Sequence, residues 1–197
     1  MAKWIGIAVV GLLVVAGFSC AGTYNSLVSM DQGVQAQWSQ VENAYQRRLD
    51  LVPNLVETVK GAAAFEKDTF TAVAEARAKA GQATIDASKI GDPAAFEKFQ
   101  QSQDALSSAL SRLLVTVEKY PELKANQNFR DLQAQLEGTE NRIAVERKRF
   151  NEAAQVFNTK RNTFPTVLIA GFFGNRFADK SYFKAQAGAE TAPKVKF

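Results

Sequence analysis

The sequence contains no histidine and a single cysteine, Cys20, among its 197 residues. Histidine is the usual general base and the commonest metal ligand in proteins, so its absence excludes histidine-based triads and the usual zinc sites. One cysteine alone excludes an internal disulfide bond. The chain also lacks a glycine-rich loop of the kind that cradles phosphates. We therefore expect no catalytic residues, no cofactor-binding residues and no metal site.

Chemistry by carboxylates alone remains a formal possibility, and it needs a cleft that perturbs the pKa values of two carboxylates. The sequence offers no sign of such a cleft, and its central acidic residues have arginines beside them. We expect a protein that is not an enzyme and has no small-molecule substrate.

Long runs of one charge are also missing. The chain has 24 basic and 20 acidic residues, a net charge of +4, and no run of five or more like charges. A basic tail or stripe is the usual electrostatic mark of nucleic-acid binding. We expect no nucleic-acid partner.

An uncharged apolar segment is present at the N-terminus. Residues 4–23 carry no charge and are dominated by Ile, Val, Leu, Ala and Gly, and about 20 such residues cross a bilayer core. We predict a transmembrane anchor over residues 1–23. Lys3 is the only charge before Asp31, which favours a cytoplasmic N-terminus and a body in the periplasm or outside the cell.

Cys20 leaves an alternative open. An apolar stretch followed by Phe18-Ser19-Cys20 is similar to a lipoprotein processing site, where the cysteine is lipidated and becomes the first residue. Gly17 and Phe18 fit that site poorly. The retained anchor is the preferred interpretation, with lipidation at Cys20 as the alternative.

The rest of the chain is predicted to be helical, since it is rich in Ala, Gln, Glu, Leu and Lys without strand-like alternation. Proline, glycine and capping residues divide it into segments of similar length. Matched lengths and short connections predict an all-α fold, an antiparallel up-and-down four-helix bundle over residues 24–162 with an irregular tail over 163–197. The predicted helices are residues 24–49, 51–80, 93–119 and 127–162.

The break between the first two helices is placed at Asp50 and Pro53. Pro53 disfavours helical geometry at Val52, and Asp50 is placed to cap a helix with Pro53 in its first turn. One continuous kinked helix is the alternative, because the apolar positions keep their phase across Pro53. We prefer the break as an interhelix turn.

Arg48 falls at the edge of the apolar arc of its helix, where a charge needs a partner. In the last helix, Glu146 lies among apolar positions and Glu140 lies at their margin. We predict a structural ion pair of Arg48 with Glu146 or Glu140 that fixes the register of the two helices.

Arg47, Asn54 and Glu57 share a polar stripe on the same helical wheel. We interpret the stripe as a solvated face that is available to a partner.

The tail contains a short apolar segment, FPTVLIAGFFGNRF, which is too short to cross a bilayer. It either packs on the end of the bundle, lies in the lipid interface, or forms a surface for another subunit or partner. The final AGAETAPKVKF has the composition of an extended arm. The residues predicted for membrane or partner contact are Phe172, Phe173, Arg176, Phe177 and Lys180.

Several long stretches resemble one known family. They are YNSLV, VQAQWSQVENAYQRRLDLVPNLVETVKG, EARAKA, EKYPELKANQNFRDLQAQLEGTENRIAVERKRFNEAAQVFN and the closing FP, YF and PKVKF. Together they are similar to the LemA family of bacterial membrane proteins over nearly the whole chain from Tyr24. The resemblance implies an N-terminal membrane segment, a helical body and a membrane-associated or scaffold-like role, with no agreed enzymatic activity. One departure is at residues 61–66, GAAAFE, where relatives commonly have Gly-Tyr and His-Glu.

Taken with the resemblance, the residues predict a non-enzymatic, membrane-anchored scaffold or adaptor of the bacterial cell envelope. We expect a single-pass inner-membrane protein that contacts membrane lipid and forms a homo-oligomer or binds an envelope membrane protein. The alternative is a self-assembling protein that organises or protects the membrane through its Phe-rich C-terminal segment.

Overall fold

The computed structural model describes residues 1–60 and 67–185, and in these ranges every regular element is a helix. This confirms the predicted all-helical class. The predicted C-terminal arm, AGAETAPKVKF, and the departure at residues 61–66 both lie outside the described residues. The elements are α1 (Ala2–Lys60), α2 (Lys67–Gln82), η1 (Ala87–Lys89), α3 (Pro93–Val117), α4 (Pro121–Ala125), α5 (Gln127–Asn162), α6 (Thr166–Phe172) and η2 (Gly174–Phe177).

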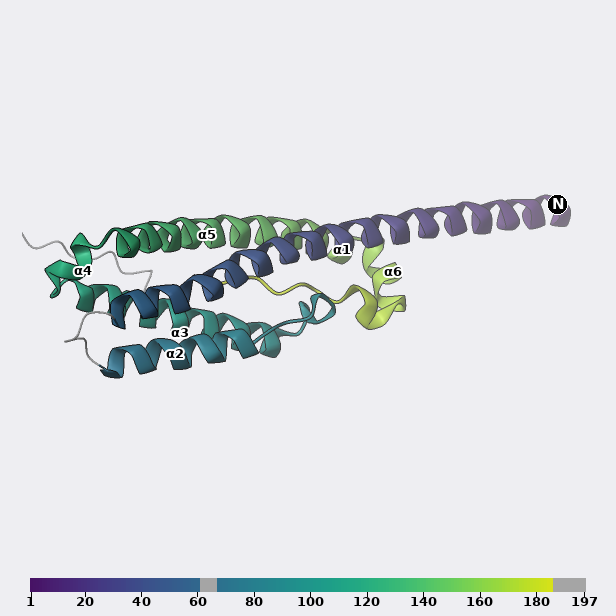
Figure 1. Cartoon of the computed structure of the whole chain (residues 1–197). Helices are drawn as coiled ribbons and strands as arrows, with labels where there is room; N and C mark the ends of the chain where they lie inside the picture. The colour runs from purple at the N-terminus through teal and green to yellow at the C-terminus, as the bar shows by residue number, and fades with distance from the viewer. Residues whose placement is uncertain (61–66, 186–197) are drawn as a thin grey trace, which may run out of the picture.

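Helix α1 is the element that organises the molecule. Its 59 residues correspond to a length of about 90 Å at 1.5 Å per residue. The apolar first part projects alone from the body, and the second part lies inside it (Figure 1). Within the described residues, α1 is the one helix that is long and apolar enough to cross a membrane.

The predicted turn at Asp50 and Pro53 is wrong, because both residues lie inside α1. Proline lacks an N–H, so Pro53 leaves the carbonyl of Leu49, four residues earlier, without its helical donor. Arg77 of α2 supplies the missing donor, with its Nε 3.0 Å from Leu49 O. The helix therefore continues through Pro53, and the freed carbonyl becomes a docking point for α2. Asp50 caps nothing here and accepts a hydrogen bond from Gln46 at 2.8 Å.

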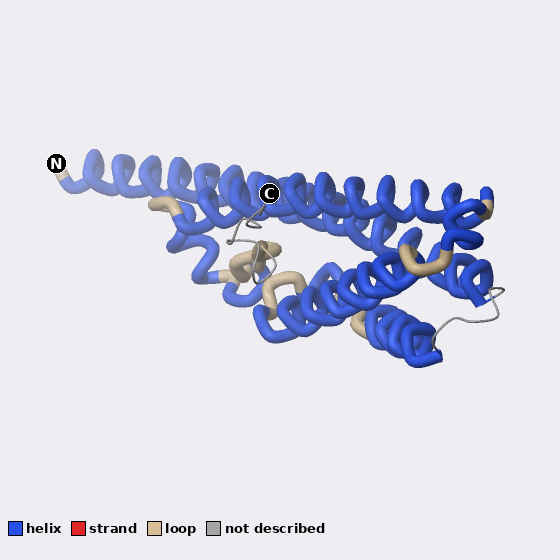
Figure 2. The backbone as a smooth tube through the Cα atoms, turned by 90° about the vertical axis from the view of Figure 1, so that its left-hand side faces the viewer, coloured by secondary structure: helices blue, strands red, loops and turns tan. Residues whose placement is uncertain are grey.

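The long helices alternate in direction (Figure 1). From its projecting N-terminal part, α1 runs to the far end of the body. Helix α2 runs back, α3 runs to the far end again, and α5 runs back, so that α6 lies at the end from which α1 projects. Helix α1 packs along α5, and α2 packs along α3. Figure 2 shows the same elongated arrangement from a second side.

Helices α3 and α5 begin close to where the sequence predicts. Asp92 caps α3, its carboxylate accepting hydrogen bonds from the backbone N–H groups of Ala94 and Ala95 at 3.0 and 3.2 Å. Asn126 caps α5 by accepting from Phe129 N at 3.3 Å. These caps satisfy donors that a helix start leaves free. Helix α5 matches the predicted 127–162, and α3 ends two residues before the predicted 119.

The interior divides into two apolar cores. The first, here called the proximal core, lies toward the projecting end of the body and is rich in aromatic rings, including Trp38, Phe96, Phe150 and Phe183. The second, the distal core, is mainly aliphatic and is built from residues such as Leu55, Leu106 and Leu113. A polar layer around Arg48 separates them along α1.

Candidate interaction surfaces and the polar layer of the body

Arg48 lies between the two cores and is 1% exposed. Its Nη1 donates to Glu140 Oε1 of α5 at 2.8 Å and to Ser107 Oγ of α3 at 2.6 Å. Its Nη2 donates to Gln103 of α3, at 2.6 Å to Oε1 and 3.2 Å to the backbone O. One guanidinium thus joins α1 to α3 and α5 through its planar set of donors.

Gln103 extends this layer to a fourth helix, because its Nε2 donates to Ala80 O of α2 at 3.3 Å. We call Arg48, Gln103, Ser107 and Glu140 the Arg48 layer. The hydrogen bonds of such a layer form in one register of the helices and are lost when one helix slides along another.

Glu146, the other acid predicted to face Arg48, does not reach it. Although it is buried, it pairs on its own helix with Arg149 at 3.1 Å and with Arg142 at 3.9 Å. Glu140, which is 42% exposed, is the acid that the structure brings to Arg48.

Arg47, the neighbour of Arg48, points to the outside of the body. It lines a cavity of about 670 Å³ between α1 and α5. Asn54 and Glu57 are exposed further along α1, and Glu57 pairs with Lys60 at 2.7 Å. The cavity is polar and carries two arginines; its lining is Gln40, Asn43, Ala44, Arg47, Gln135, Gly138, Thr139 and Arg142.

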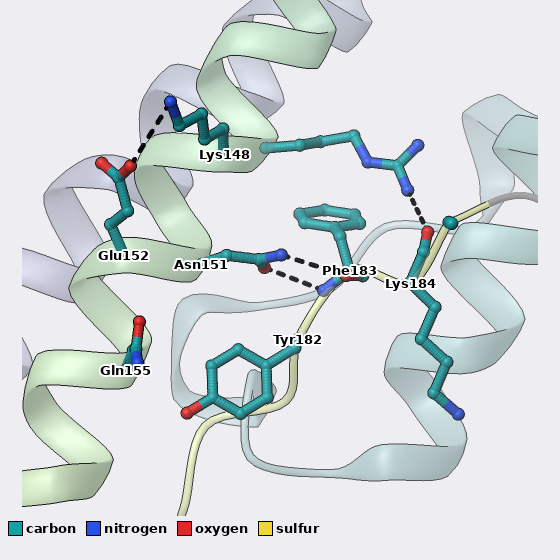
Figure 3. Close-up of a pocket in the computed structure, with 9 residues that line it drawn as sticks. Lys148, Asn151, Glu152, Gln155, Tyr182, Phe183 and Lys184 are labelled. Carbon is teal, nitrogen blue, oxygen red and sulfur yellow. Dashed lines mark hydrogen bonds and ion pairs between the residues drawn. The ribbon is translucent and has the colours of Figure 1, made fainter.

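An extended segment, residues 178–185, runs back over α3 and α5, and we call it the strap. Three side-chain amides each hold both backbone groups of one strap residue. Asn151 donates to Phe183 O at 3.0 Å and accepts from Phe183 N at 2.9 Å (Figure 3). Asn158 does the same for Lys180 at 2.9 and 2.8 Å, and Gln100 for Lys184 at 3.1 and 3.2 Å.

These clamps replace the sheet partners that an extended backbone otherwise needs. They also place the ring of Phe183 in the proximal core. The ring lies against Phe96 with centroids 4.8 Å apart and against Phe150 at 5.6 Å. Arg147 covers it from outside at 4.7 Å and donates to Lys184 O at 2.7 Å. Phe183, near the end of the described chain, is thus part of the proximal core.

Lys180 is buried rather than free for a partner. Its Nζ lies 2.6 Å from Asp31 Oδ1 of α1, and the two side chains are 9% and 4% exposed. The ammonium also lies 4.9 Å from the ring centroid of Phe157. This ion pair ties the strap to α1.

The residues predicted for membrane or partner contact therefore separate into two groups. Phe177 is fully buried and, like Lys180, belongs to the interior, whereas Phe172 is 86% exposed and Phe173 is 38% exposed. Arg176 is exposed beside them. The structure adds Phe164 and Leu168, which are 76% and 66% exposed.

Cys20 is a free, exposed cysteine within the apolar part of α1. Its lipidation stays a prediction.

Two titratable groups on α1 have shifted pKa values. Desolvation raises the pKa of Glu42 above its ordinary 4.5, a hydrogen bond with Trp38 acts in the opposite direction, and the nearby charge of Asp86 adds to the rise. Burial likewise raises the pKa of Tyr45 above 10.0. Within residues 1–60 and 67–185, no three acidic or cysteine side chains are grouped so as to hold a metal ion.

Sequence reasoning missed the clamps, the Lys180–Asp31 pair and the bond from Arg77 to Leu49. A signal for two of the clamps was present, because Asn151 and Asn158 lie seven residues apart on the apolar side of α5. A buried amide needs partners, and both find them in the strap.

This chain is similar to known proteins over most of its length. The LemA family model matches residues 37–197. Magnetosome protein MamQ 2 of Paramagnetospirillum magneticum is 27% identical over 184 residues, covering 85% of this chain and 67% of the relative. Magnetosome protein MamQ of Magnetospirillum gryphiswaldense is 28% identical with the same coverage. Protein LemA of Metamycoplasma hominis is 24% identical over 153 residues, covering 78% of this chain and 66% of the relative. Since the family model spans most of its length, this chain belongs to the LemA family.

Proposed function

We propose that this protein is a non-enzymatic, membrane-anchored scaffold or adaptor, built as an antiparallel four-helix bundle. The observation that carries the proposal is the continuity of α1, in which a membrane-length apolar segment and a central helix of the body are one element. A body attached in this way is held next to the bilayer, with the body part of α1 continuing directly from the membrane segment. Such an attachment suits the presentation of a surface to partners in the same membrane.

The surface proposed for a partner is the cavity between α1 and α5 that contains Arg47 and Arg142. Two arginines and several amides there favour a partner segment rich in carboxylates or backbone carbonyls. The relatives named as magnetosome proteins support a role within a larger cellular structure. The body would lie in the periplasm or outside the cell, because Lys3 is the only charge before the span.

The test is to extract the full-length protein from its own membranes in mild detergent, then measure its native mass and identify co-purifying chains. We expect a stoichiometric second protein that is lost in Arg47→Glu. The matched control is Lys79→Glu, which makes the same charge change at an exposed site on α2 and should keep the partner. Retention of the partner in Arg47→Glu would place the binding surface elsewhere.

The alternative is a self-assembling protein that organises or protects the membrane. One observation favours it, which is the exposed Phe-rich surface around α6. A large homomeric assembly that carries only lipid, in the same native-mass experiment, would support this alternative and argue against the adaptor.

A further inference from the structure

Two exposed apolar residues share one face of α6. Leu168 and Phe172 lie four residues apart in the helix and are 66% and 86% exposed, and Phe164, just before the helix, is 76% exposed. The opposite side of α6 carries Thr166 and Ala170, which are buried. We call the exposed side the α6 face.

The position of this face along α1 follows from the length of the membrane segment. Residues 4–23 of α1 span about 30 Å at 1.5 Å per residue, which is the thickness of a bilayer core. Tyr24 comes directly after them, so it lies at the boundary between lipid and water when α1 crosses the membrane. Trp4, 77% exposed, begins the same span, and aromatic residues at both ends are typical of membrane helices.

Helix α6 is attached at that level. The ring of Phe173 packs on Tyr24 with centroids 4.8 Å apart, and the ring of Phe177 packs on Tyr24 at 5.4 Å. In both views α6 runs across the direction of α1 at the end from which α1 projects (Figures 1 and 2). A helix that crosses a membrane-spanning helix at the lipid boundary lies roughly in the plane of the interface.

The charges around α6 are consistent with a position at the lipid boundary. Residues 162–178 contain one charged residue, Arg176, and no acidic residue. Arg176 is exposed, and a cation beside exposed apolar rings favours contact with anionic headgroups.

We infer that the α6 face is a second membrane contact, inserted in the interfacial layer of the bilayer from which α1 projects. The inference rests on the proposed membrane anchoring of α1 but not on any partner of the body. Two contacts, one across the bilayer and one in its surface, fix the rotation of the body about α1. The side of the body that is turned toward partners in the same membrane would then be set by the contact of the α6 face with lipid.

The test uses the full-length protein with Cys20 replaced by Ala and single cysteines labelled with an environment-sensitive fluorophore. The protein is placed in vesicles of phosphatidylethanolamine and phosphatidylglycerol, with and without lipids that carry a quencher. Test sites are Leu168→Cys and Phe172→Cys. Leu12→Cys reports the anchor, and Val115→Cys, 68% exposed on α3, is the control in water.

We expect the labels at residues 168 and 172 to emit as in an apolar medium and to be quenched by lipid, like the label at residue 12 and unlike that at residue 115. Arg176→Glu should shift the label at residue 168 toward water in these anionic vesicles, and less in zwitterionic ones. Water-like emission at residues 168 and 172 with a quenched label at residue 12 would overturn the inference and leave the anchor intact.

Apolar emission without lipid quenching at residues 168 and 172 would also overturn it, in favour of a protein contact. A water-like label at residue 12 would overturn the anchoring proposal and this inference together.

Discussion

The bond from Arg77 to Leu49 gives a prediction that links a proline to a residue on another helix. Arg77→Met keeps most of the apolar stem but removes the donor to Leu49 O, which lies at 3.0 Å. The carbonyl then loses both its helical donor, because of Pro53, and its replacement. Hydrogen bonds to charged groups contribute about 1.5–3 kcal/mol, and an unpaired buried acceptor costs about 1–3 kcal/mol. We expect Arg77→Met to lower the free energy of unfolding by about 2 kcal/mol.

The matched experiment repeats the change in a Pro53→Ala background, where the N–H of residue 53 can serve Leu49 O. There Arg77→Met should cost less than half as much. Urea unfolding of the full-length protein in detergent, followed by circular dichroism, measures the four free energies of this cycle. Lys79→Met, at an exposed site on α2, should change stability by less than about 0.5 kcal/mol. An equal cost of Arg77→Met in both backgrounds would refute the explanation of why Pro53 is tolerated.

Three further predictions concern buried or partly buried charges. Arg48→Met removes four hydrogen bonds and leaves the buried Gln103 side chain without its donor, so it should destabilise the body by about 3 kcal/mol or more in urea unfolding. Adding Glu140→Gln should cost little extra, because Glu140 has then already lost its partner; a large additional cost would argue against their pairing. Lys180→Met leaves Asp31 buried without its cation and should cost about 3–5 kcal/mol, whereas Lys180→Met with Asp31→Asn should recover a large part of that loss; equal stability of the single and double variants would contradict this. Because the pKa of Glu42 is raised in the folded state, the folded protein binds the proton more tightly than the unfolded chain, so the contribution of Glu42 to stability falls as pH rises through its pKa. Glu42→Gln should flatten that part of the pH profile, measured by urea unfolding on either side of pH 4.5, and an unchanged profile would show that Glu42 is not responsible.

The all-helical class, the apolar N-terminal helix and the bounds of α5 follow from local signals. Asn126 and Asp92 cap helices in the structure as their side-chain chemistry predicts. These signals act over a few residues, so they are visible in the sequence.

The break at Pro53 was predicted wrongly because its outcome depends on a tertiary contact. Proline normally leaves a carbonyl without a partner, and nothing near Pro53 in sequence supplies one. The donor comes from Arg77, 28 residues from Leu49. The continuous apolar phase across Pro53 was the signal that favoured one helix.

The tail was the least predictable part, because the burial of its side chains also depends on tertiary contacts. Phe172 and Phe177 are both aromatic residues in one short apolar segment, yet one is 86% exposed and the other fully buried. The difference is decided by Tyr24 and by the strap clamps of α5, which the local sequence does not reveal. The same clamps bury Lys180, whose charge suggested a surface position.

With α1 anchored in a bilayer as proposed, its unbroken course would make the body a rigid extension of the membrane segment. From Tyr24 to the end at Lys60 the helix extends for about 55 Å at 1.5 Å per residue. Membrane helices tilt to match the thickness of the surrounding lipid, and a tilt of about 10° would move the far end by about 10 Å. A small change in bilayer thickness would therefore appear as a large displacement at the tip of the body.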